Sequence, residues 1–309
     1  MLFNLKQAAY VNNKKIFCEG HMDKNTGDRG LLYIVATPIG NLEDITLRAI
    51  RILKEVDLIA AEDTRRTRKL LNAYKITTPL ISLHEHNERE KSALIIAKIK
   101  GGMNVAYVSD AGTPCVSDPG YQLVKFAQAA NIRIIPIPGP SALITALSAA
   151  GFPADNFSFC GFLPTRENKR RLFLESLKDE ERTIIFYESP VRFLSTLKDI
   201  YEILGNREIV VARELTKIFE EIKRGEVIDF IKSDSENKTR GEFTVILRSV
   251  KKTPIFYADE DIEKKLLLLW EDKNVSLRDA VAEVIKKTGL QKKKVYDLAV
   301  KLRLQKADI

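Results

Sequence analysis

The sequence is poor in the residues that mark metal-binding and disulfide-rich proteins. Its three cysteines, Cys18, Cys115 and Cys160, are odd in number and far apart, so it has neither a CxxC pair nor a disulfide framework. This usage favours a reducing, cytoplasmic environment. His84 and His86 offer two imidazoles, but on an extended segment they would point to opposite sides, and no third ligand is evident. We therefore expect no metal site.

Several sequence patterns are also missing. No apolar run approaches the roughly 20 residues of a membrane helix, and the start of the chain lacks the apolar core of a secretory signal. The first strand-like run is not followed by GxGxxG, and GxxxxGK[ST] does not occur, which disfavours a dinucleotide fold and a P-loop. With 45% hydrophobic and 30% charged residues, the sequence is typical of a soluble globular protein.

The chain carries an excess of basic residues, with a formal net charge of +8. Over half of this excess lies between Ser276 and Ile309, where nine basic side chains face four acidic ones. This segment is predicted to form a helix, a turn at 288–290 and a second helix that opens with Lys292, Lys293 and Lys294. A helix-turn-helix of this charge favours contact with nucleic acid, and a solvated basic domain is the alternative.

The order of apolar runs predicts an α/β fold. Strand-like runs at 31–36, 57–61, 104–108 and 132–137, with helical patterns at 46–55 and 122–130, predict a mostly parallel sheet. The pattern restarts near Gly151, with strands expected at 157–162, 183–187, 208–212 and 242–247. A hairpin turn expected at 235–241 makes this second sheet mixed. We predict a flexible arm at 1–30, α/β domains at 31–143 and 144–250, a linker at 251–254, and a helix-turn-helix-like RNA-contacting domain at 255–309.

Five turn-rich loops follow predicted strands, which predicts a ligand cleft between the two domains. The loop VSDAGTPCVSDPG at 108–120 contains Asp110 and Asp118 and no lysine or arginine, so it would repel a phosphate. Its chemistry suits a cationic or zwitterionic small ligand, and S-adenosylmethionine fits this description. Within the loop, the sequence Ser-Asp-x-Gly occurs twice. We assign Asp110 and Thr113, in and after the first copy, to ligand binding, and Asp118, Pro119 and Gly120 of the second copy to the turn that starts the next helix.

Basic clusters at 62–69 and 165–171 follow predicted strands beside this cleft. Together with the basic segment near the end of the chain, they favour the passage of a phosphate backbone over the cleft. The residues that we predict to contact RNA are Arg65, Arg66, Arg68, Arg166, Lys169, Arg170, Lys292, Lys293 and Lys294.

Six motifs carry a resemblance to a known family: VATPIGNL at 35–42, AEDTR at 61–65, VSDAGTP at 108–114, PGPSA at 138–142, FYESP at 186–190 and ARELTK at 212–217. They resemble the tetrapyrrole methylase superfamily, and the last two resemble its bacterial ribosomal RNA small subunit methyltransferase I family. The resemblance covers residues 31 to about 247, and the end of the chain resembles that family's C-terminal helix-turn-helix.

The resemblance implies a class III methyltransferase fold, with two α/β domains flanking an S-adenosylmethionine cleft and a small C-terminal helical domain. It also implies a homodimer and 2′-O-methylation of a cytidine ribose, cytidine 1402 of 16S rRNA in the small ribosomal subunit. The cofactor positions that it implies are Pro38, Asp110, Ala111, Gly112, Thr113, Ser117, Ala142, Tyr187, Leu215 and Gly241.

A ribose 2′-hydroxyl is a weak nucleophile that must lie in line with the methyl group, so a general base or a nearby cation would help. We predict Glu62, Lys217 and Arg65 as catalytic residues. Asp63 and Glu214 are further candidates, and all five could instead be structural, with Glu62 and Asp63 holding the neighbouring arginines. Two other functions stay open: a methyltransferase acting on a tetrapyrrole or corrin precursor, and a non-catalytic, cofactor-sensing nucleic-acid-binding protein.

Overall fold

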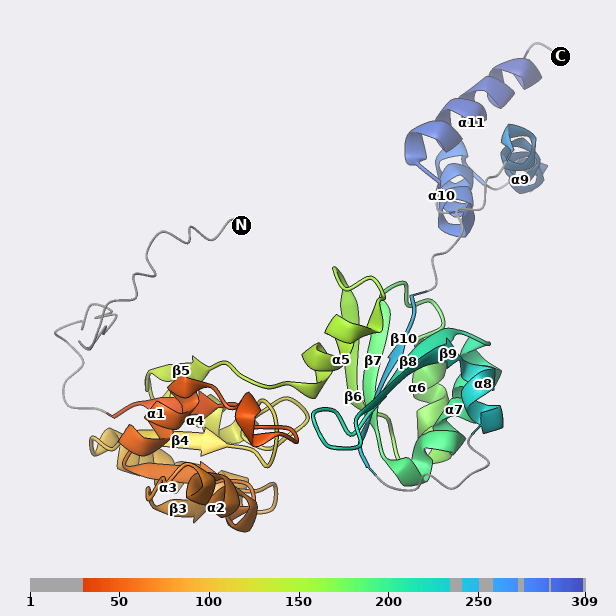
Figure 1. The fold of residues 1–309 in the computed structure, drawn as a ribbon. Coiled ribbons are helices and arrows are strands. Elements are labelled where there is room, and N and C mark those ends of the chain that lie inside the picture. The colour runs from red at the N-terminus through yellow and green to blue at the C-terminus, as the bar shows by residue number, and fades with distance from the viewer. Residues whose placement is uncertain (1–29, 234–240, 250–257, 272–274, 289, 308–309) are drawn as a thin grey trace, which may run out of the picture. The chain divides into compact units, whose positions relative to one another are not determined.

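The computed structural model describes residues 30–233, 241–249, 258–271, 275–288 and 290–307. Three predicted segments lie outside the described residues: the N-terminal arm apart from Gly30, the linker at 251–254, and the hairpin turn at 235–241 apart from its last residue. The chain divides into two compact units, Met1–Ser249 and Val250–Ile309. Figure 1 shows two α/β domains, each built on its own sheet, within the first unit, and a group of helices in the second.

The first sheet is entirely parallel, where a mostly parallel sheet was predicted, in the order β3-β2-β4-β1-β5. Its strands are β1 (Leu32–Val35), β2 (Leu58–Ala61), β3 (Leu80–Ser82), β4 (Val105–Val108) and β5 (Ile134–Ile137). The sequence analysis predicted four of these five strands and missed the edge strand at 80–82. One face is covered by α1 (Leu47–Glu55) and α2 (Thr64–Ala73), and the other by α3 (Glu88–Lys100) and α4 (Tyr121–Ala129). β2 and β4 are buried on both faces, which explains their uninterrupted apolar runs.

The second sheet is mixed, as predicted, in the order β6-β7-β10-β8-β9. Its strands are β6 (Phe157–Phe162), β7 (Thr183–Glu188), β8 (Glu208–Arg213), β9 (Glu221–Glu226) and β10 (Phe243–Leu247). β6 and β7 are parallel, and the other three pairings are antiparallel. One face packs against α6 (Glu167–Ser176), α7 (Pro190–Leu204) and α8 (Val227–Ser233), and the other against α5 (Ala142–Ala150).

The second unit contains α9 (Asp259–Glu271), α10 (Leu277–Thr288) and α11 (Lys292–Ala307) around one apolar core. The two predicted helices are present, and Ser276 caps α10 by accepting a hydrogen bond from the Asp279 N–H at 3.1 Å. The sequence analysis missed α9, whose Ile262 and Leu266 are fully buried in this core. Among the helices that the structure describes, none is long and apolar enough to cross a membrane.

Candidate functional site

The loops that follow β1 and β4 meet at the carboxyl edge of the first sheet. These strands are neighbours, and the helices that follow them, α1 and α4, lie on opposite faces of the sheet. This arrangement opens a crevice at the strand ends, where α/β sheets bind ligands. The two loops are joined by a bridge in which Thr37 and Gly112 exchange two backbone hydrogen bonds of 2.9 Å. The Thr113 hydroxyl donates to the Pro140 carbonyl at 3.2 Å and ties in a third loop.

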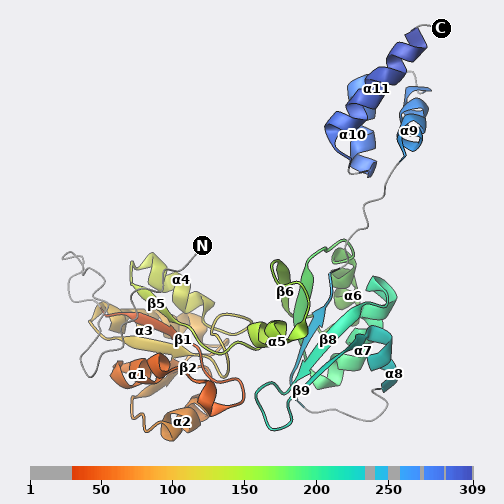
Figure 2. The ribbon, with the colours of Figure 1, turned by 45° about the horizontal axis from the view of Figure 1, so that its top comes forward.

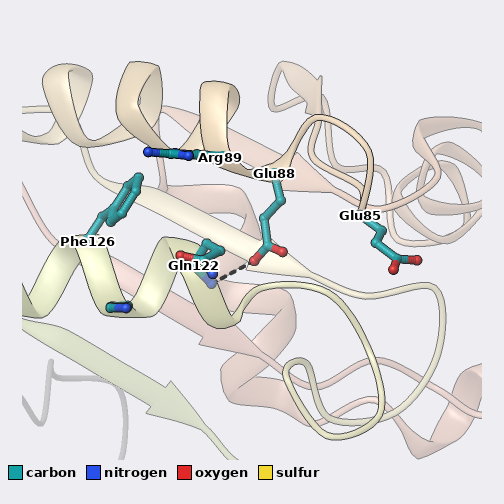
Figure 3. Close-up of a pocket in the computed structure, with 6 residues that line it drawn as sticks. Glu85, Glu88, Arg89, Gln122 and Phe126 are labelled. Carbon is teal, nitrogen blue, oxygen red and sulfur yellow. Dashed lines mark hydrogen bonds between the residues drawn. The ribbon is translucent and has the colours of Figure 1, made fainter.

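The other end of the 108–120 loop is fixed from α3. The Glu88 carboxylate accepts hydrogen bonds from the Gly120 N–H at 2.9 Å and the Gln122 N–H at 2.8 Å, as Figure 3 shows for Gln122. Gly120, at φ 120°, is the residue that caps α4, and a side chain there would collide with the Tyr107 ring. The loop is therefore held at both ends by groups from other elements.

A cavity of about 230 Å³ lies where this loop meets the second sheet. Its first-domain wall is formed by Ile39, Ala111, Gly112, Thr113, Val116, Ser117 and Asp118. Its other wall is formed by Ser141, Ala142, Phe162, Tyr187, Glu188, Ser189, Pro190, Gly241, Glu242, Phe243 and Thr244. Seven of the ten predicted cofactor positions line the cavity, on one wall or the other. Pro38, Asp110 and Leu215 do not.

Three carboxylates stand in the cavity wall, and two of them have cationic partners. Glu188 is buried and binds Arg192 at 2.6 Å, while its other oxygen accepts from the Thr196 hydroxyl at 2.7 Å. Glu242 forms an ion pair with Lys217 at 3.3 Å. Among the described residues no cation pairs with Asp118, and no lysine, arginine or histidine lines the cavity.

Asp118 has an unusual environment for a loop aspartate. Burial raises its pKa to about 6; the Ser109 hydroxyl opposes this shift, while the negative charges of Glu62 and Asp110 add to it. The sequence analysis placed Asp118 only in the turn before α4. That turn is present, but Glu88 provides the carboxylate for the first N–H groups of α4, and Asp118 faces the cavity.

The predicted binding residue Asp110 organises the loop. Its carboxylate accepts from the Asp63 N–H at 3.0 Å and pairs with Arg66 at 3.2 Å, while its own N–H donates to Glu62 at 3.1 Å. Burial raises the pKa of Glu62, an effect that this hydrogen bond from Asp110 opposes. Asp63 accepts from the Arg65 N–H and guanidinium, each at 2.8 Å, and these bonds lower its pKa to about 2.

Lys217 is held between two glutamates. Its ammonium lies 2.9 Å from Glu214 and 3.3 Å from Glu242. Burial lowers the pKa of Lys217, but these partners outweigh burial and raise it above its usual value. Lys217 is therefore charged at neutral pH, and it reaches the cavity wall only through Glu242. None of Glu62, Lys217 and Arg65 lines the cavity.

Most of the predicted RNA-contacting residues are exposed: Arg65, Arg66, Arg68, Arg166, Lys169, Lys292, Lys293 and Lys294. Lys294 also pairs with Asp259 at 2.9 Å. Arg170 is different, because it is 4% exposed and its guanidinium binds Asp199 of α7 at 2.7 Å. This arginine joins α6 to α7 and is not available to RNA, which corrects the prediction.

Comparison with known proteins places these features in a family. The family model for tetrapyrrole (corrin/porphyrin) methylases matches residues 31–230. A Thermotoga maritima protein named ribosomal RNA small subunit methyltransferase I is 54% identical over 218 residues, which are 71% of this chain and 98% of that protein. Proteins of the same name from Escherichia coli O157:H7 and Synechocystis sp. are each 46% identical, over 88% of this chain and 95% and 98% of their own lengths.

Two solved structures have the same fold as the first unit. Uroporphyrin-III-C-methyltransferase from Thermus thermophilus has a TM-score of 0.51 at 21% identity, over 71% of this chain and 94% of that one. A cobalt precorrin-4 methyltransferase has a TM-score of 0.55 at 19% identity, over 70% of this chain and 94% of that one. At this identity the likeness concerns the fold alone, and it confirms the predicted fold class.

Proposed function

The chain belongs to the ribosomal RNA small subunit methyltransferase I family of the tetrapyrrole methylases, and from this we propose that it methylates 16S rRNA. The methyl donor is S-adenosylmethionine, and the acceptor is the ribose 2′-hydroxyl of a cytidine, cytidine 1402. The observation that carries this proposal is the cavity in which the 108–120 loop faces the FYESP segment at the end of β7.

The residues of this cavity fit a cofactor that carries cations, hydroxyls and an adenine ring. A carboxylate without a cationic partner can face positive charge, the hydroxyls of Thr113 and Ser117 can bond to polar groups, and aromatic rings can cover the base. Its volume of about 230 Å³ lies just below the roughly 300–1,000 Å³ of typical ligand pockets, so the ligand would extend beyond its mouth. When bound, S-adenosylmethionine supplies an electrophilic methyl group on a sulfonium.

We propose that Asp118 contacts a positive charge of this cofactor. The other two carboxylates of the wall are neutralised by Arg192 and Lys217, which leaves Asp118 to provide the negative charge. Tyr187 supports the site from the opposite wall. Its hydroxyl accepts from the Leu143 N–H at 3.2 Å, and its ring packs edge-on against Phe159 at 5.0 Å.

The roles of the catalytic candidates follow from their partners. Glu62 accepts a hydrogen bond from the Asp110 N–H. It therefore helps to position the 108–120 loop, and it is also a candidate base. Lys217 fixes Glu242 in the cavity wall, and its charge can lower the pKa of a hydroxyl bound nearby. We keep Glu62 and Lys217 as the first candidates for the chemical step and assign Arg65, which is exposed, to substrate contact.

We propose that RNA crosses the exposed arginines and lysines that follow β2 and β6, and that residues 255–309 add a second contact surface. We also propose that the protein acts in the cytoplasm as a homodimer, where its ribosomal substrate is assembled. We propose that the second unit serves substrate capture rather than methyl transfer, because none of its described residues lines the cavity.

The proposal is tested by incubating the protein with isotopically labelled S-adenosylmethionine and small ribosomal subunits that lack the modification. Label should appear in 16S rRNA, and nuclease digestion with mass spectrometry should place it on one cytidine ribose. Persistent RNA binding without transfer would instead support a cofactor-sensing binding protein. Label in a tetrapyrrole precursor, supplied in a parallel reaction, would support the small-molecule alternative.

A further inference from the structure

The loop that joins β8 to β9 exposes two adjacent apolar side chains. Ile218 is 96% exposed and Phe219 is 78% exposed, although most side chains of this size lie in the cores. Figure 2 shows this loop at the end of the second sheet. Apolar area left in water has a free-energy cost, and neighbouring exposed apolar residues mark contact surfaces. We call Ile218 and Phe219 the apolar tip.

The apolar tip is carried by an ordered turn. Glu214 and Thr216 adopt positive φ angles of 50° and 65°, which side chains other than glycine rarely adopt. The turn is closed by hydrogen bonds from the Lys217 N–H to the Glu214 carbonyl and from the Glu220 N–H to the Lys217 carbonyl, each 3.0 Å. Leu215, just before the tip, is buried in the core beneath. A surface held in this way loses little conformational freedom on binding.

The same turn is fastened to the cavity. Glu214 accepts from the Glu242 N–H at 3.1 Å and from the Lys217 ammonium at 2.9 Å, and Glu242 lines the cavity. On its other side the Thr216 hydroxyl accepts from the Asn41 N–H at 3.0 Å, in the loop after β1. The turn that carries the tip is therefore joined to the cavity wall through Glu214 and Glu242.

We propose that the apolar tip packs against an unstacked base of the substrate RNA, beside the nucleotide that is methylated. This rests on the proposed function, in which the target ribose is brought to the mouth of the cavity, and it places the target nucleotide outside the neighbouring stack. Proteins hold such splayed nucleotides by stacking bases on aromatic side chains. The neighbouring charges favour a base over a phosphate: Lys217 is neutralised by Glu214 and Glu242, and Lys223 pairs with Glu221 at 2.7 Å.

A second copy of the chain is a less suitable partner for the tip. A stable interface of standard size takes about 20–30 residues from each partner. After the apolar tip the chain continues with Glu220 and Glu221, and the next exposed apolar residue is Ile222, which is 41% exposed. The tip has the size of one base rather than of a subunit interface.

The test compares the full-length protein with its Phe219→Ala and Phe219→Tyr variants. Small subunits, or a 16S rRNA fragment with 2-aminopurine next to the target cytidine, serve as substrate. Loss of one stacked base corresponds to about a 5- to 150-fold weaker affinity. Phe219→Ala should show this weaker RNA affinity together with a smaller change in 2-aminopurine fluorescence on binding. Phe219→Tyr should keep the affinity and the fluorescence change of the parent. Affinity for S-adenosylmethionine, measured by calorimetry, should not change.

Leu94→Ala is the matched control, because Leu94 is an exposed apolar residue of α3, a helix that carries none of the proposed RNA contacts and lies outside the cavity wall. It should leave RNA affinity unchanged. Equal RNA affinity and equal 2-aminopurine signal in the parent and in Phe219→Ala would overturn the proposal. A change of oligomeric state in Phe219→Ala, seen by light scattering, would overturn it in favour of contact between copies. If the parent protein methylates no RNA, the proposed function fails. If the parent methylates RNA but Phe219→Ala binds it equally well, only the proposal for the apolar tip fails.

Discussion

Replacement of Asp118 by asparagine should weaken cofactor binding while stabilising the free protein. The substitution preserves the shape of the side chain and removes its negative charge. A hydrogen bond to a charged group contributes about 1.5–3 kcal/mol, so affinity for S-adenosylmethionine should fall roughly 10- to 150-fold. Calorimetry with S-adenosylhomocysteine, which lacks the sulfonium charge, identifies the group involved: an equal loss for both ligands indicates the ammonium, and a selective loss indicates the sulfonium.

The effect on stability has the opposite sign. The pKa of Asp118 is raised from 3.8 to about 6, so the folded protein binds its proton more tightly than the unfolded chain does. The ionised carboxylate therefore costs stability, which decreases between about pH 4 and pH 6 and stays reduced above pH 6. The full shift corresponds to about 3 kcal/mol, and partial exposure reduces this to about 1–2 kcal/mol.

Urea unfolding of the cofactor-free protein measures this term. Asp118→Asn should be more stable than the parent at pH 7.5 and nearly equal to it at pH 4. Binding of S-adenosylmethionine to the parent should weaken as the pH falls below 6, and binding to Asp118→Asn should vary less. The combination of unchanged affinity at pH 7.5 with unchanged stability would refute the cavity role assigned to Asp118.

Three further predictions follow from the contacts described. At least one of Glu62→Gln and Lys217→Ala should slow single-turnover methyl transfer about a hundredfold or more with cofactor bound; normal rates in both would remove these residues from the chemical step. Arg170→Ala should destabilise the protein by about 1.5–3 kcal/mol in urea unfolding, because it removes the buried partner of Asp199 and leaves only the more exposed Arg171 bound to it; a smaller loss in Arg171→Ala is the control. Removal of 250–309 should weaken RNA capture and spare cofactor affinity, and an equal loss of both would make that unit structural.

The sequence predicted the two sheets because their strands are long apolar runs that end at turn-forming residues. It missed β9, whose sequence EIKRGE is charged, because this edge strand is mostly exposed and pairs on one side only. It missed α9 because the continuous apolar run Leu266–Leu269 obscures the helical spacing of Ile262 and Leu266, which are both buried, while Leu268 is exposed. Pattern analysis depends on a contrast between faces, and these segments do not provide it.

At the site, sequence patterns identified the loops but not the direction of each side chain. Asp110 and Asp118 occupy the same position in two copies of one short motif, yet the first bonds to Arg66 and the second faces the cavity. Arg170 belongs to a run of basic residues, but its partner Asp199 lies 29 residues away on another helix. These roles are decided by packing between elements that are distant in sequence, which local patterns do not encode.

The central claim is tested most directly by mapping ribose methylation in 16S rRNA by mass spectrometry. The rRNA is taken from cells that lack the gene for this chain, from the parent strain, and from the deletion strain complemented with the gene. The account predicts that a single cytidine 2′-O-methyl group, at position 1402, is lost on deletion and restored by the parent gene. An unchanged methylation map in the deletion strain would contradict it.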